Sequence, residues 1–120
     1  MRYAVSGANT AAIEPVTGAL RNLLGKDITT NRVFWLRAVW YGSSGTQGDL
    51  YLYDATAGAT SGTKVAAYPA LMVALDNPGL NAGYREIAPP GLKFKSGCCA
   101  WLAVSGAIAV GECGGAGYEE

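Results

Sequence analysis

Two segments in the first half of the chain have the side-chain pattern of β-strands. Residues 32–41 and 49–54 are rich in aromatic and β-branched side chains, which fit well in a pleated sheet. In the second segment leucine alternates with tyrosine, which predicts one aliphatic face and one aromatic face. The residues between them, 42–48, are mostly glycine and small polar residues, and they predict a loop. We therefore expect a β-sheet protein with these two strands at its centre.

Further short strands follow at intervals along the chain. The pattern predicts strands at 63–68 and 84–87, whereas 71–75 fits a short strand or a helix equally well. Residues 76–79 have the composition of a turn, and Pro89-Pro90-Gly91 should redirect the chain sharply. About eight short strands separated by glycine- and proline-rich turns are typical of an all-β protein, either a β-sandwich or a jelly roll.

The clearest hairpin is expected from Cys98 to Cys113, with its turn at Ser105-Gly106. A two-residue loop would place Cys98 directly opposite Cys113. Both faces of this hairpin are mostly apolar, whereas a sheet with one solvated face should alternate apolar with polar residues. The hairpin should therefore lie inside the domain, or its outer face should meet a neighbour.

The two ends of the chain have a different composition. Residues 1–31 have few large side chains and predict an N-terminal arm, followed by one sandwich domain over 32–120. A helix over Pro15–Leu24 is an alternative, because proline suits the first turn and Gly25 suits the end, although Gly18 weakens it. The glycine-rich residues 114–120 predict a short, flexible acidic tail.

The composition limits the partners of the domain. The 120 residues suffice for one domain with a core of its own, although alanine and glycine make that core thin. Nine basic and nine acidic side chains balance, so no electrostatic field favours nucleic acid or an anionic membrane. Only 15% of the residues are charged, against about 25% in typical soluble domains. So few charges suggest that other subunits cover part of the surface.

No set of residues suited to catalysis or metal binding is visible. There is no histidine, the usual general base and the commonest metal ligand. Cys98 and Cys99 are adjacent, so they should point to opposite faces and bind no common ion. Cys98 and Cys113 could form a disulfide in the predicted hairpin, but the cytosol would keep them reduced. We expect three small buried thiols, no enzyme activity, no metal and no cofactor.

Two other candidate motifs have simpler structural explanations. Asp49 and Asp54 lie at the ends of one strand and should point to opposite faces, which is unsuitable for a glycosidase pair. Both are expected to cap turns through nearby backbone N–H groups. Two segments contain residue types found in phosphate-binding loops, but in the wrong order: Gly42, Gly45 and Gly48, and residues 61–64. We expect both segments to be linkers.

The aromatic side chains are the candidate binding residues. Stacking on single-stranded nucleic acid normally needs a basic groove, and the chain has too few cations near these positions to build one. Core packing and a protein interface both enrich tryptophan and tyrosine. We predict an interface formed by Trp35, Trp40, Tyr51, Tyr53 and Trp101. Trp101 is the first candidate, because it should project from the hairpin face opposite Leu102 and Val104.

The sequence also suggests where the chain is made. Met1-Arg2 is not followed by an apolar segment, so no secretory signal is visible. The least polar stretch, 97–111, is shorter than the roughly 20 residues that cross a bilayer. We expect synthesis in the cytoplasm and no membrane partner.

Two longer segments resemble a known protein class. They are LYLYDATAGATSGTK, residues 50–64, and IAPPGLKFKSGCCAWLAVSG, residues 87–106. This order of a leucine–tyrosine–aspartate strand, a small-residue loop and a PPGLKFKSG turn resembles small β-sandwich structural proteins of tailed bacteriophages, of the head decoration (cement) type. The resemblance covers about residues 32–113, and its motifs are short and largely structural. The long N-terminal arm and the doubled Cys98-Cys99 do not match it.

The resemblance implies a function on the virion. If the resemblance holds, we expect a capsid decoration protein that binds major-capsid subunits on the capsid surface. It should act as a homo-oligomer, with a trimer favoured at local three-fold positions. Two alternatives remain: a phage tail, neck or baseplate module, and a carbohydrate-binding β-sandwich that uses exposed tyrosines.

Overall fold

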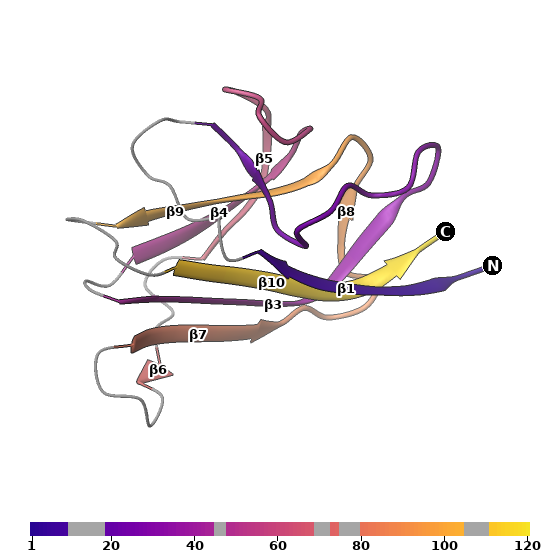
Figure 1. Cartoon of the computed structure of the whole chain (residues 1–120). Coiled ribbons are helices and arrows are strands. Elements are labelled where there is room, and N and C mark those ends of the chain that lie inside the picture. Colours follow the sequence, from indigo (N-terminus) through magenta and orange to yellow (C-terminus); the bar gives the residue numbers. More distant parts are fainter. Residues whose placement is uncertain (10–18, 45–47, 69–72, 75–79, 105–110) are drawn as a thin grey trace.

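The protein is an all-β sandwich, as the sequence predicts. The computed structural model describes residues 1–9, 19–44, 48–68, 73–74, 80–104 and 111–120. These residues form ten strands and no helix, and the strands build two antiparallel sheets that lie face to face (Figure 1).

Each sheet has a simple order of strands. Sheet A runs β1 (Tyr3–Asn9), β10 (Gly111–Glu119), β3 (Phe34–Ser44), β7 (Leu80–Glu86) and β6 (Val73–Ala74), while β8 (Leu92–Phe94) pairs with the start of β3. Sheet B runs β2 (Arg21–Asn22), β9 (Cys98–Val104), β4 (Gly48–Asp54) and β5 (Thr63–Tyr68). Of the expected strands, 63–68 has its predicted bounds, and 84–87 overlaps the end of the longer β7.

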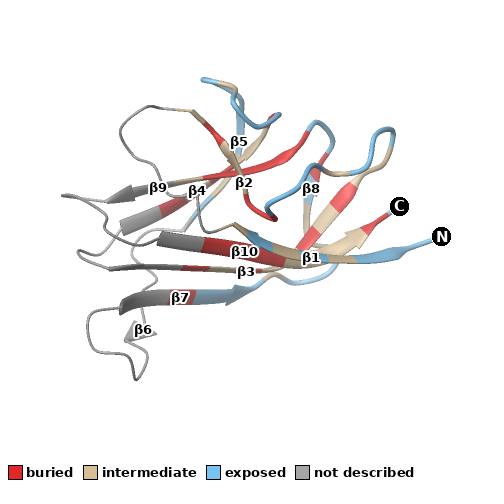
Figure 2. Cartoon of the chain, viewed as in Figure 1, coloured by how far each residue is buried: buried red, intermediate tan, exposed pale blue. Residues whose placement is uncertain are grey.

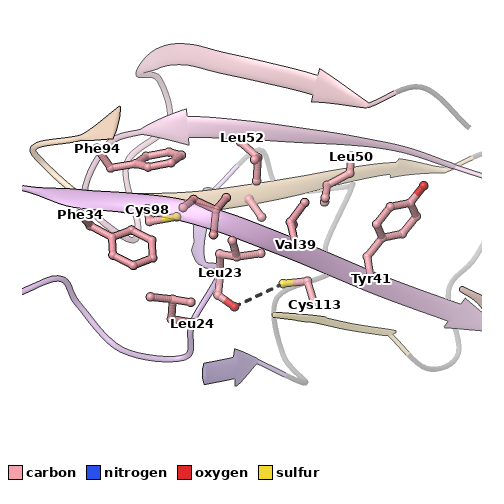
Figure 3. Close-up of a cluster of buried hydrophobic side chains, with 12 residues drawn as sticks. Leu23, Leu24, Phe34, Val39, Tyr41, Leu50, Leu52, Phe94, Cys98 and Cys113 are labelled. Atoms are coloured by element: carbon pink, nitrogen blue, oxygen red, sulfur yellow. Dashed lines mark hydrogen bonds between the residues drawn. The ribbon is translucent and has the colours of Figure 1, made fainter. Parts of the chain in front are cut away.

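The core lies between the two sheets. Its largest fully buried side chains are Leu23, Phe34, Leu36, Leu50, Leu52 and Phe94. Figure 3 shows leucines from β4 facing the side chains of β3 and β8 across this space. The predicted alternation of β4 is confirmed, because Leu50 and Leu52 are buried while the tyrosines between and beside them are only partly buried.

A bulge in β3 keeps both halves of this long strand facing the core. The pairing with β10 shifts register between Ala116 and Gly117, which leaves Arg37 as an extra residue in β3. Phe34 and Leu36 are buried before the bulge, and Val39 and Tyr41 after it. Without the extra residue the inward face would change sides at Arg37.

The predicted hairpin from Cys98 to Cys113 is wrong. β9 belongs to sheet B, where it pairs with β2 and β4, and β10 belongs to sheet A, where it pairs with β1 and β3. Each strand has a neighbour on both sides, so more of its backbone is paired than one hairpin allows. The expected turn at 105–106 lies outside the described residues. β3 and β4, on either side of residues 45–47, also belong to different sheets.

The glycine-rich C-terminal segment is a strand inside sheet A, and the predicted flexible tail is also wrong. β10 reaches Glu119 and is paired along both edges. Its glycines allow close packing: a side chain at Gly115 would press on Leu36, and one at Gly117 would overlap the carbonyl oxygen of Trp35. The residues here are small because neighbouring groups leave no space for side chains. In the sequence alone, such a glycine-rich segment has the same composition as a flexible tail.

The described parts of residues 1–31 are built into the sandwich, in contrast to the predicted arm. β1 pairs with β10 over its whole length, and Leu23 is fully buried in the core. The backbone N–H of Thr29 donates to the buried carboxylate of Glu119 at 2.9 Å. Of the alternative helix, residues 15–18 lie outside the described residues and Arg21–Asn22 form β2. The large leucines at 20, 23 and 24 explain this difference, because they add core to an otherwise thin sandwich.

Candidate interaction surfaces

Sheet A presents a face away from the core that carries mostly small and aromatic side chains. By register this sheet A outer face consists of Ala4, Ser6, Ala8, Trp35, Ala38, Trp40, Tyr84, Glu86, Lys93, Gly114, Ala116 and Tyr118. Tyr84 is 57% exposed, and the outward residues of β1 are exposed (Figure 2). Within this set the charges are Glu86 and Lys93, so a protein partner could cover the centre of the face without burying an ion.

One end of this face carries a row in which two stacked aromatic rings lie between two cations. Tyr118 and Trp35 are opposite each other on β10 and β3, with ring centroids 6.5 Å apart and nearly parallel planes. The Arg2 guanidinium lies 4.6 Å from the Tyr118 ring centre, and the Lys93 ammonium lies 5.5 Å from that of Trp35. The Tyr118 hydroxyl donates to the carbonyl of Pro90 at 3.1 Å. These contacts fix the rings in place across the strands.

Trp40 forms the other aromatic position of this face. It lies between Gly114 on β10 and Tyr84 on β7, both directly opposite it in register. A side chain at Gly114 would overlap the indole ring, so the ring covers the backbone of β10 at this point. Trp40 is therefore only partly buried and extends the apolar surface toward Tyr84.

A shallow groove lies beside the bulge of β3. It has a volume of about 450 Å³ and is lined by Arg37, Ala38, Tyr84, Glu86, Ile87, Ala88 and Pro89. The Arg37 Nε donates to the carbonyl of Ile87 at 2.9 Å, which ties the bulge to the segment after β7. The groove thus combines a guanidinium, a carboxylate and an exposed aromatic ring.

Sheet B carries a second aromatic group on its own outer face. Tyr51 and Trp101 are opposite each other on β4 and β9, and their ring centroids are 6.0 Å apart. The Lys64 ammonium lies 5.3 Å from the Tyr51 ring centre. Both rings are partly buried, so they form a covered patch more than an open surface.

A small second core explains that cover. Leu20, Ala55 and Cys99 are buried together on this side of sheet B, and Tyr53 and Trp101 pack against them. Leu20 is held there by two backbone hydrogen bonds, from its N–H to Ala59 and from the N–H of Gly58 to its carbonyl. Trp101 therefore stabilises the fold of this region as well as facing outward.

The five predicted interface residues lie on opposite sides of the molecule. Trp35 and Trp40 are on the sheet A outer face, whereas Tyr51, Tyr53 and Trp101 are on sheet B. One partner surface cannot contact all five at once. Tyr84 and Tyr118 also belong to the first face, although the sequence did not single them out. Residues 112–118 show no alternation of apolar and polar side chains, so no local pattern in the sequence could have placed Tyr118.

Asp54 has the turn-capping role that the sequence predicts. Its Oδ1 accepts hydrogen bonds from the backbone N–H groups of Lys95, Ser96 and Gly97, at 3.0, 2.7 and 3.2 Å. The next residue, Ala55, also donates its N–H to the carbonyl of Gly97 at 3.2 Å. The two segments that carry the bacteriophage resemblance are therefore joined in one structural unit.

The cysteines are buried and form no disulfide in the part of the chain that the structure describes. Cys98 and Cys113 lie in the main core, and the Cys113 thiol approaches the Leu23 carbonyl at 3.9 Å (Figure 3). The Cys99 thiol donates to the carbonyl of Ala55 at 3.0 Å. Burial raises the pKa of Cys98 well above its ordinary range, and burial together with Asp27 and Asp54 raises the pKa of Cys99 to about 11. Both thiols are thus protonated at neutral pH, a poor state for a nucleophile or metal ligand.

Other chemistry-bearing motifs do not assemble into a site. The described residues contain no group of three or more acidic or sulfur ligands that could hold a metal ion. Residues 61–64 lead into strand β5, whereas a phosphate loop leads into a helix. No helix within the described ranges is long and apolar enough to span a membrane.

No protein-family model, curated protein or solved structure matches this chain. The sheet A outer face and the groove beside it are therefore the features on which a function can be argued.

Proposed function

We propose that this protein is a non-enzymatic structural protein of a tailed-bacteriophage virion, which decorates the capsid by binding major-capsid subunits. The observation that carries the proposal is the sheet A outer face, where Trp35, Trp40, Tyr84 and Tyr118 lie among alanine, glycine and serine residues with few charges. A face of this composition suits a protein partner, since interface centres are depleted in charge and enriched in aromatic residues.

The fold supports this role in a second way. The rings of Trp35 and Tyr118 are held by cross-strand contacts, so their binding to a partner would cost little side-chain entropy. The unit formed by Asp54 and residues 95–97 joins the two segments on which the bacteriophage resemblance rests. A rigid sandwich with a prepared surface is what a cement protein requires.

Electron microscopy of particles carrying the protein tests the proposal. Decoration predicts many copies on the capsid surface, with the sheet A outer face against the major capsid protein. The matched variants are Trp40→Ala, on this face, and Lys64→Ala, on sheet B. Particles should lose the first variant and keep the second. Density in the tail, neck or baseplate would instead support the alternative virion role, and absence from particles would contradict both.

A carbohydrate-binding role is the second candidate, and the groove beside the bulge favours it. Arg37 and Glu86 offer hydrogen bonds, and Tyr84 offers a ring on which a sugar can stack. A glycan array separates this role from capsid binding. Specific glycan binding that is lost in Tyr84→Ala would support it, and a blank array would exclude the sugars tested.

A further inference from the structure

The guanidinium of Arg37 is held in place at the side of the groove. Its Nε donates to the carbonyl of Ile87 at 2.9 Å, and the N–H of Ile87 donates back to the carbonyl of Arg37 at 2.9 Å. The aliphatic part of the side chain passes close to Gly91, where an added Cβ would lie 3.0 Å from Cδ of Arg37. Gly91 also has a φ of 103°, so both the space and the backbone favour glycine there. The side chain is therefore confined before any ligand binds.

The outer nitrogens of this guanidinium have no partner within the described ranges. The bond from Nε to Ile87 is the one hydrogen bond that the side chain makes there, and no described carboxylate forms an ion pair with it. An arginine that is held through Nε keeps both Nη groups for a second contact. Two parallel Nη donors match the two oxygens of a carboxylate, which makes such a contact bidentate.

The other groups that line the groove limit which carboxylates can enter. Tyr84, Ile87 and Pro89 offer apolar surface, and Tyr84 is 57% exposed. Glu86 is also exposed, and it forms no ion pair with a described residue. Its negative charge would repel a second acidic group of the ligand. The groove therefore suits a single carboxylate beside apolar atoms, in preference to a polyanion such as nucleic acid.

The groove is continuous with the sheet A outer face, since Ala38, Tyr84 and Glu86 belong to both. A protein that covers this face also reaches Arg37, and it carries carboxylates as aspartate and glutamate side chains. We propose that Arg37 is a specificity-determining residue of this face, which binds one aspartate or glutamate side chain of the protein partner in the groove. A partner without that acid would cover the guanidinium and leave it unpaired, which disfavours the wrong partner. The identity of the partner as a capsid protein rests on the proposed function, whereas the carboxylate site does not.

Nuclear magnetic resonance of the purified protein provides the test. The probes are N-acetyl-glutamate N-methylamide and its glutamine analogue, which lacks the charge. The glutamate probe should shift the Nε–H signal of Arg37 and the ring signals of Tyr84. It should bind there about tenfold more tightly than at Arg2, an exposed arginine outside the groove, because the Arg37 fork is held in place. The glutamine probe should shift neither group.

Three variants separate the fork from charge alone. Arg37→Lys keeps the positive charge without the fork and should weaken binding of the glutamate probe about tenfold. Glu86→Gln removes the repelling carboxylate from an exposed position and should tighten binding about twofold to threefold at low salt. The matched control is Lys93→Gln, which removes an exposed cation of the same face outside the groove and should leave binding unchanged.

Several results would overturn the proposal. They are equal binding of the two probes, equal affinity at Arg2 and Arg37, full binding in a folded Arg37→Lys variant, and weaker binding in Glu86→Gln. If Arg37→Lys does not fold, the comparison of Glu86→Gln with Lys93→Gln decides. Tighter binding of glucuronate than of the glutamate probe would also overturn it, and would favour the sugar-binding role. The measurement uses purified protein without particles, so its outcome is independent of whether the chain binds a capsid.

Discussion

The indole ring of Trp40 on β3 covers the backbone of Gly114, the residue directly opposite it on β10. The indole takes the space that a side chain at position 114 would need, and it shields that part of the strand from water. An aromatic ring over a cross-strand glycine stabilises a sheet that glycine alone would weaken. The pair also creates the apolar surface between Gly114 and Tyr84.

Gly114→Ala should destabilise the protein by about 1 kcal/mol, because the new methyl group displaces the Trp40 ring from the strand. Urea unfolding measures the change. The double variant Gly114→Ala with Trp40→Ala should lose less than the sum of the two single changes, because the clash is absent once the ring is removed. Additive losses would show that the two residues do not interact.

Gly117→Ala should be more damaging, on the order of 3 kcal/mol, because the obstacle is the backbone carbonyl of Trp35, which cannot rotate away. Thermal unfolding should show a larger drop than for Gly114→Ala. Ala116→Ser, at the neighbouring outward position, is the control and should change the melting temperature little. Equal effects of the three substitutions would contradict the packing role of the glycines.

Asp54→Ala should lower the free energy of unfolding by about 1–3 kcal/mol, because three backbone N–H groups lose a charged acceptor. Asp54→Asn keeps an acceptor oxygen of the same shape and should lose less. Hydrogen exchange at residues 95–97 should be faster in the alanine variant, while exchange in the paired residues of β3 stays slow. Unchanged exchange at 95–97 would show that the carboxylate does not hold this turn.

The buried thiols should make the protein less stable in alkali. Folding raises the thiol pKa, so the native state holds these protons more tightly than the unfolded chain does. The stability that this difference contributes is fully present below the ordinary thiol pKa of about 8.5. The free energy of unfolding should then fall as the pH rises from about 8.5 toward about 11. In this range the thiols of the unfolded chain have ionised, whereas native Cys99 has not.

The urea midpoint at about pH 8 and about pH 10 measures this loss, and Cys99→Ala is the matched variant. Its midpoint should fall less steeply with pH than that of the wild type, whatever its stability at neutral pH. Parallel pH profiles would show that Cys99 ionises equally in both states.

Trp101→Ala should destabilise the domain, since the ring covers the second core and packs on Tyr51. The expected loss in the free energy of unfolding is about 3 kcal/mol for a fully buried ring, and it should be smaller here because Trp101 is already partly exposed. Trp101→Phe should be tolerated much better, because the indole N–H is buried and meets no acceptor among the described residues. A melting temperature unchanged by Trp101→Ala would restore this residue as a pure interface candidate.

The sequence predicted the strands better than their partners. The two-residue period of 50–53 correctly separated buried leucines from outward tyrosines, because burial of one sheet face imposes that period. Pairing is different, since it depends on distant segments. Cys98 and Cys113 are near in sequence but belong to different sheets, and no local pattern distinguishes a hairpin from a crossing between sheets.

Glycine caused the second kind of error. Gly115 and Gly117 have the composition of a flexible tail, yet each is small because a neighbour leaves no room. The same holds for Leu20, Leu23 and Leu24, which looked too few to form a core of their own and instead complete cores built by distant strands. The candidate aromatic residues were found from composition, but their division between two faces needed the sheet order.

The pairing of β1 with β10 has a consequence for how the chain folds during synthesis. Tyr3 is opposite Glu119, so β1 is synthesised long before β10, the strand that it pairs with. β10 also joins β1 to β3, so β1 can enter sheet A only after β10 has been made. Folding should therefore be slow and dominated by long-range contacts. A chain that stops before residue 111 would lack β10, so it would expose the edges of β1 and β3 that β10 pairs with, and it should be degraded by cellular proteases.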